Sequence, residues 1–118
     1  MKLHQIVSAY RALDGIAENK SLTARESYGI MKLTRALTDD FNYAAKKQDE
    51  LLKTYGSPDQ DTPGKYKLRD PESYNREMRE VLETEADVTF TPVTLRGDIT
   101  GISPRDLAWL ESFVTVEE

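Results

Sequence analysis

The sequence predicts a mainly α-helical protein of the α+β class, with a long helical hairpin, a third helix, a small extended or β element and a short C-terminal helix. Three observations predict this class. Apolar residues recur at steps of three and four through the first half of the chain, which is the spacing of one helix face. A stretch rich in Gly, Pro and Asp then separates two halves. Beyond residue 87 the apolar period changes to two before helical spacing returns. We expect one domain over 1–118, made of the hairpin at 1–56, a loop at 57–70, and the remaining elements at 71–118.

The first predicted helix is an apolar stripe that stops near the sequence "ENKS". Thr23 and Glu26 then form the pattern of a capping box, in which a hydroxyl and a carboxylate satisfy free backbone amides and start a second helix. The stripe of the first helix contains Leu3, Ile6, Val7, Tyr10, Leu13, Ile16 and Ala17.

The second predicted helix is unusually long because no proline occurs between Ala24 and Tyr55. Gly56 then suits a left-handed helix end. Gly29 lies inside this helix, and we expect close approach of the first helix to compensate its cost. The first helix is too short to cover the far end, so we expect the third helix or a second copy of the chain to cover it and the protein to be a homo-oligomer. The candidate oligomer seam consists of Phe41, Ala44, Gln48, Leu51, Leu52 and Tyr55.

The loop after Gly56 contains "PGKYK", which resembles a fragment of a phosphate-binding loop. A helix precedes it and the glycine-rich run is missing, so we reject a phosphate site. "KYKL" is compatible with a short extended segment. Asp70 and Pro71 mark the start of the third helix. Val88, Phe90, Val93 and Leu95 then alternate with polar residues, which predicts an extended segment interrupted by Pro92. The last predicted helix starts at 103 and directs Leu107, Leu110, Phe113 and Val114 inward.

Composition excludes several classes of function. The 118 residues include no cysteine, so disulfides, thiolate metal sites and a cysteine nucleophile are absent. No run of 18 apolar residues occurs, so we expect no membrane-spanning helix, and the first residues lack a secretory pattern. The net charge is −5, and residues 57–118 carry fourteen Asp and Glu against seven Lys and Arg. This acidic half disfavours general nucleic-acid binding and offers a surface for self-association or for a basic partner.

No constellation of residues predicts catalysis, a cofactor or a resident metal. His4 is the sole histidine, and no serine or acid is linked to it by spacing. Glu83, Glu85 and Asp87 stand at alternate positions and would share one face of an extended segment, where they could bind Mg²⁺ or Ca²⁺ in a metal-dependent enzyme. We consider a solvated acidic patch the better interpretation, because the segment follows a helix end.

A basic face on the second helix is the remaining candidate site. Its cations fall within about 80° on a helical projection, opposite the apolar seam. Such a stripe could contact nucleic acid or an acidic protein surface, although a solvated helix face also has this composition. The residues of this possible interaction face are Arg25, Lys32, Arg35, Lys46 and Lys53.

Together these segments resemble a family of small uncharacterised proteins encoded by tailed bacteriophages and prophages. The resemblance runs through "QIVSAYRALDGIA", "SYGIMKLTRAL", "LLKTYG" and "DPESYNREMREVLETE" to the ending at Leu107, Leu110, Glu111 and Phe113, and so covers nearly the whole chain. It brings no established activity with it. It implies a phage or prophage protein in the bacterial host cytoplasm or the virion. We therefore expect a non-enzymatic protein that contacts a phage or host protein, as a virion or tail-assembly component or as a host-directed factor.

Overall fold

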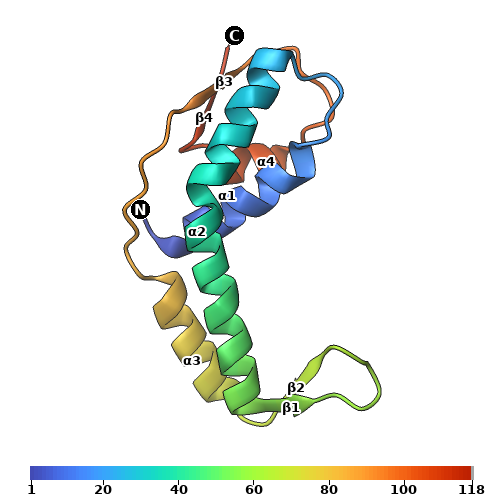
Figure 1. Cartoon of the computed structure of the whole chain (residues 1–118), viewed down its shortest axis with the longest axis vertical. Coiled ribbons are helices and arrows are strands. Elements are labelled where there is room, and N and C mark those ends of the chain that lie inside the picture. Colours follow the sequence, from blue (N-terminus) through green and yellow to red (C-terminus); the bar gives the residue numbers. More distant parts are fainter. Residues whose placement is uncertain (118) are drawn as a thin grey trace.

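The computed structural model describes residues 1–117 and confirms the predicted fold class. Its helices and strands are α1 (Leu3–Ile16), α2 (Ala24–Tyr55), β1 (Gly56–Pro58), β2 (Tyr66–Leu68), α3 (Pro71–Leu82), β3 (Val93–Leu95), α4 (Pro104–Trp109) and β4 (Val114–Val116). Figure 1 shows α2 running almost the full length of the molecule, with α1 crossing its first half obliquely. α1 and α2 therefore form an open helical hairpin.

The start of α2 is fastened as the sequence predicts. Thr23 accepts a hydrogen bond from the Glu26 amide at 3.1 Å, and the Glu26 carboxylate accepts one from the Thr23 amide at 2.8 Å. Glu26 also accepts from the Arg96 side chain, at 3.2 Å, which joins the start of α2 to the segment after β3. This carboxylate is 95% buried, so the capping box is also a long-range tie.

The core lies where α1, the first half of α2 and the C-terminal segment meet (Figure 1). The sequence predicted that α1 approaches Gly29 closely, and this prediction was wrong. A Cβ at Gly29 would lie 3.2 Å from a methyl group of Val93, so the close neighbour is β3 and not α1. The buried core residues are Leu3, Ile6, Ala9, Ala12, Leu13, Ile16, Ile30, Leu33, Leu37, Ala44, Val93, Leu95, Leu110 and Phe113.

The C-terminal segment is more compact than the alternating pattern indicates. Only Val93–Leu95 of the predicted extended segment forms a strand, and it pairs in parallel with β4, Val93 facing Val114. α4 ends at Trp109, and the turn after it buries Leu110 and Phe113. Leu107 was expected to point inward, but 38% of it is exposed. The helix is too short to bury both turns of its apolar side.

We define the arm as the second half of α2 from residue 41, together with the β1–β2 hairpin and α3. α3 runs back antiparallel to α2, as expected, and the arm projects away from the core (Figure 1). The predicted loop at 57–70 contains an antiparallel hairpin that pairs Gly56 with Leu68. Gly56 is extended, with φ −137° and ψ 178°, so the predicted left-handed helix end was wrong. Glycine is needed because a Cβ there would lie 2.7 Å from the carbonyl oxygen of Leu52.

Candidate interaction surface

The arm contains almost no fully buried side chain. Among its described residues only Ala44 and Gly56 are buried, and α3 contributes none. The candidate seam therefore lies on a surface that is only partly covered. Phe41, Leu51, Leu52 and Tyr55 are half-buried, and Gln48 is exposed.

Contacts within the chain cover one side of this seam. The Phe41 ring stacks on Tyr10 of α1, with ring centroids 4.1 Å apart. Gln48 donates a hydrogen bond to the Tyr74 hydroxyl of α3 at 3.3 Å. The Glu77 carboxylate beside the Tyr55 hydroxyl raises the pKa of Tyr55. α1 and α3 thus cover part of the seam. Along the arm α2 and α3 pack only on each other, so the flanks of this helix pair remain open.

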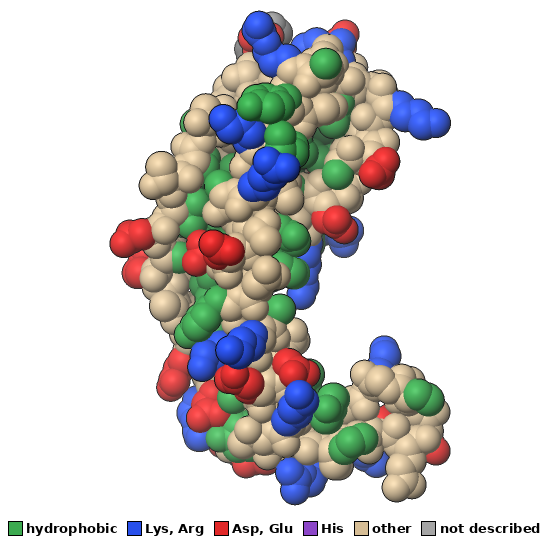
Figure 2. All heavy atoms as spheres, viewed as in Figure 1, with side chains coloured by type: hydrophobic (Ala, Val, Ile, Leu, Met, Phe, Trp, Pro, Cys, Tyr) green, Lys and Arg blue, Asp and Glu red, His purple; other side chains and the backbone are tan. Residues whose placement is uncertain are grey.

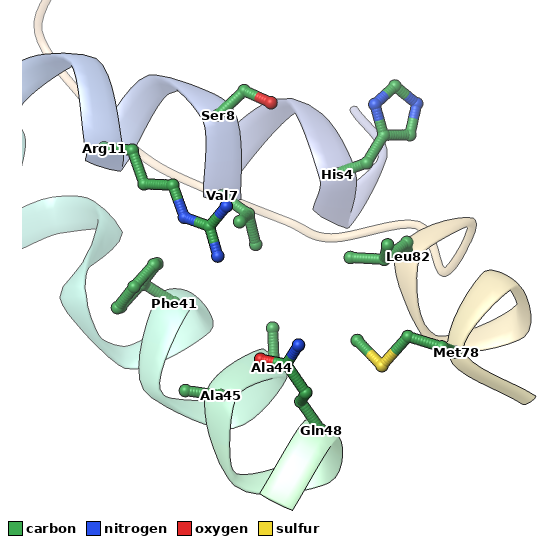
Figure 3. A pocket seen from close by; sticks show the side chains of 10 residues that line it. All are labelled: His4, Val7, Ser8, Arg11, Phe41, Ala44, Ala45, Gln48, Met78 and Leu82. Atoms are coloured by element: carbon green, nitrogen blue, oxygen red, sulfur yellow. The ribbon is translucent and has the colours of Figure 1, made fainter. Parts of the chain in front are cut away.

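A groove of about 330 Å³ lies on one of these flanks, where α1 leaves the arm. Figure 3 shows Met78 and Leu82 pointing from α3 towards α2, and the guanidinium group of Arg11 pointing into the groove from α1. The His4 ring points away from it. The lining residues are His4, Val7, Ser8, Arg11, Phe41, Ala44, Ala45, Gln48, Met78 and Leu82.

The groove combines an apolar wall with a free cation. None of its ten lining residues, all of them described, is acidic, and Arg11 forms no ion pair within residues 1–117. A neighbouring hollow of about 440 Å³ shares His4, Met78 and Leu82 and extends the groove along α3. The surface suits an apolar segment that carries a carboxylate, because such a segment would cover the wall and pair with Arg11.

All five cations of the possible interaction face on α2 are exposed, but some of them already have partners within the chain. Lys53 pairs with Asp49 at 3.0 Å, and the hydrogen bond that its ammonium group donates to this carboxylate raises the pKa of Lys53. Lys32 lies over the ring of Tyr28, 5.5 Å from its centroid. Figure 2 shows basic and acidic side chains mixed over the arm. Only Arg25, Lys32 and Arg35 form a run of cations beside the core, which is short for a nucleic-acid interface.

The acidic residues after α3 serve as anchors for the N-terminus. Glu83 pairs with Lys2 at 3.1 Å, and this hydrogen bond lowers the pKa of Glu83. Glu85 pairs with the amino group of Met1 at 3.0 Å. The described part of the chain holds no group of three His, Cys, Asp or Glu residues placed to bind a metal ion. Glu83, Glu85 and Asp87 are therefore not assembled into the metal site that their spacing allowed.

Sequence reasoning missed the groove and its free arginine. Arg11 follows Val7 by one helical turn, so the sequence does place the two on one face of the first helix. Their position over α2 and α3 depends on the angle at which α1 crosses α2, and residue spacing does not specify that angle.

No family model, curated protein or solved structure matches this chain. Within residues 1–117, no helix has both the length and the apolar character needed to cross a membrane.

Proposed function

We propose that this chain is a non-enzymatic phage or prophage protein that acts through protein–protein contact made by its arm. The observation that carries the proposal is the half-covered apolar face of α2 and α3. Among the described residues of the arm only Ala44 of α2 and Gly56 of β1 are buried. The origin and the two settings, a virion or tail-assembly component or a host-directed factor, rest on the family resemblance. The protein acts in the bacterial host cytoplasm or in the virion.

The far end of the arm is held in place before any partner arrives. The Arg69 side chain donates hydrogen bonds to the carbonyl oxygens of Thr54 and Gly56, at 3.3 and 3.2 Å. The Arg69 amide donates to the carbonyl oxygen of Tyr55 at 2.7 Å, which fastens the β1–β2 hairpin to the end of α2. A preformed surface loses less conformational entropy on binding, so an exposed apolar face of this kind supports stable contacts.

The experiment is site-specific photo-crosslinking in bacterial cells that express the phage or prophage genes around this one. A photoreactive residue at Ala45, which lines the groove and is exposed, should give discrete protein adducts. Ala24 is also an exposed alanine of α2, but it is the first residue of the helix and lies outside the arm, so it is the matched control position. Equal adduct yields at the two positions would contradict a contact through the arm.

Complementation tests whether the contact matters for function. A phage or prophage that lacks the gene should regain its phenotype with the wild-type chain or with Ala24→Glu, and not with Ala45→Glu. The glutamate side chain occupies part of the groove and offers Arg11 a carboxylate within the same chain, so it competes with a partner for both the space and the free cation. Ala24 lies on an exposed first turn of α2, which accepts a glutamate. Full rescue by Ala45→Glu would refute the proposed use of the groove.

A further inference from the structure

The molecule exposes more surface than a compact protein of its mass. Its accessible area is 8139 Å², whereas folded monomers of 13.4 kDa expose about 6,500 Å². Its radius of gyration is 16.8 Å, whereas a compact domain of this length has about 13.5 Å. The excess area, about 1,600 Å², falls within the range of about 1,000–2,500 Å² that each chain of an obligate homodimer buries.

The arm accounts for the excess accessible surface. Apart from Ala44, every buried core residue belongs to α1, the first half of α2 or the C-terminal segment. The arm is a pair of antiparallel helices, and such a pair covers each helix on one side only. Two more helices would complete a four-helix bundle, in which apolar positions of the kind found at Leu52, Met78 and Leu82 become interior.

We propose that the groove is closed by the arm of a second copy of this chain, packed antiparallel about a two-fold axis near Gln48. This rests on the proposed function, because it names the partner of the same surface. A two-fold interface uses one patch twice, so the four helices come from two identical α2–α3 pairs. Gln48 lies midway between Phe41 and Tyr55, and the axis there lets both ends of the seam be covered equally.

The charges agree with this antiparallel arrangement. Arg11 lies at the Phe41 end of the groove, where α1 crosses (Figure 3). The two-fold axis brings the Tyr55 end of the second copy's arm to the Phe41 end of the first. That end of the arm includes the acidic first turn of α3. Glu72 stands in that turn, is exposed and forms no ion pair within residues 1–117. The symmetry then gives two equivalent pairs, each between Arg11 of one copy and Glu72 of the partner subunit.

The first test is the mass in solution, measured by light scattering and sedimentation from about 1 to about 100 μM, the range in which weak dimers dissociate. The wild-type chain should have about twice its monomer mass of 13.4 kDa. Ala45→Glu should be monomeric over this range with unchanged helical circular dichroism, and Ala24→Glu should remain dimeric. A wild-type monomer at the highest concentration, or a dimeric Ala45→Glu, would overturn the proposal.

A charge exchange tests the antiparallel register without altering the groove wall. Arg11→Glu and Glu72→Arg should each weaken association at least about tenfold, because each places like charges opposite one another at two symmetric sites. The double variant should return to within about threefold of the wild type. A double variant no tighter than either single one would overturn the register.

The outcomes separate this inference from the proposed function. A monomeric wild-type chain whose residue 45 still crosslinks to a different protein in cells would overturn the second copy and support the wider proposal. Adducts that contain only this chain, together with a dimer that Ala45→Glu disrupts, would support both.

Discussion

Replacing Glu26 by glutamine tests the tie between the start of α2 and the segment after β3. The Glu26 carboxylate is 5% exposed and accepts hydrogen bonds from the amides of Thr23 and Arg96, at 2.8 and 2.9 Å. The hydrogen bond from the Thr23 amide has the largest effect on the pKa of Glu26, and the one from the Arg96 amide acts in the same direction. Together they hold this pKa at about 2, below the usual 4.5, although burial opposes the shift. The charged form is therefore bound more tightly in the folded state than in the unfolded chain.

The pKa difference sets the size of the effect. A difference of about 2.5 pKa units corresponds to about 3 kcal/mol, at 1.36 kcal/mol per unit. Glutamine keeps one acceptor but directs an NH₂ group towards Arg96, so the variant should lose about 2–3 kcal/mol of unfolding free energy at pH 7. Glu85→Gln is the matched control. It breaks an ion pair whose carboxylate is 71% exposed, and should cost under about 1 kcal/mol.

The assay is urea unfolding followed by circular dichroism at one fixed protein concentration, repeated between pH 7 and pH 2. Because the folded pKa is lowered, the stabilisation is fully present above about pH 4.5 and is lost as the pH falls towards 2. The difference between the wild type and Glu26→Gln should shrink over this interval. A difference below about 0.5 kcal/mol at pH 7, or one that does not change between pH 4.5 and 2, would refute the reasoning.

Three further predictions follow from other contacts. Gly56→Ala should cost about 2–4 kcal/mol in urea unfolding, because its Cβ would lie 2.7 Å from a backbone oxygen; a loss under about 0.5 kcal/mol would contradict the close approach. Gly15→Ala, with nothing within 4 Å, should stabilise by about 0.5–1 kcal/mol, and Gly29→Ala should gain less because of Val93; equal gains would contradict the Val93 contact. The wild-type chain should cause no salt-dependent mobility shift of DNA or RNA at low salt; a shift abolished by Lys32→Glu with Arg35→Glu would establish a nucleic-acid interface instead.

Local rules predicted the helices well because each boundary has a local cause. Thr23 and Asp70 cap α2 and α3 through hydrogen bonds to residues three positions on, and Pro71 occupies the first turn of α3. Gly56 shows the limit of such rules. Its position at a helix end predicted a left-handed cap, but glycine is required because a Cβ would lie 2.7 Å from the Leu52 carbonyl oxygen of α2 and 3.0 Å from the Lys67 carbonyl oxygen of β2.

The candidate site was predicted only as a seam on one helix. The lengths of α2 and α1 predicted that α1 leaves α2 uncovered from Phe41 onward, but Phe41 stacks on Tyr10 of α1 and Ala44 is buried, so the partly covered stretch begins beyond them. The groove also needs Met78 and Leu82 from α3 and Arg11 from α1, and these meet only through the crossing of three helices. Glu83 and Glu85 show the converse: their spacing suggested a metal site, but Lys2 and the N-terminal amine, over 80 residues away, neutralise them.

The length of α2 links the fold to the proposed function. A chain of this size forms one small core, and here that core is complete with α1, the first half of α2 and the C-terminal segment. The second half of α2 and the whole of α3 add no fully buried residue to it except Ala44. The arm contributes little to the core, but its structure is well defined. Asp70 caps the start of α3, Arg69 holds the β1–β2 hairpin against the end of α2, and the apolar faces of α2 and α3 are aligned. These features are needed to hold an apolar surface in a fixed shape, and a surface of fixed shape favours a contact with another protein chain.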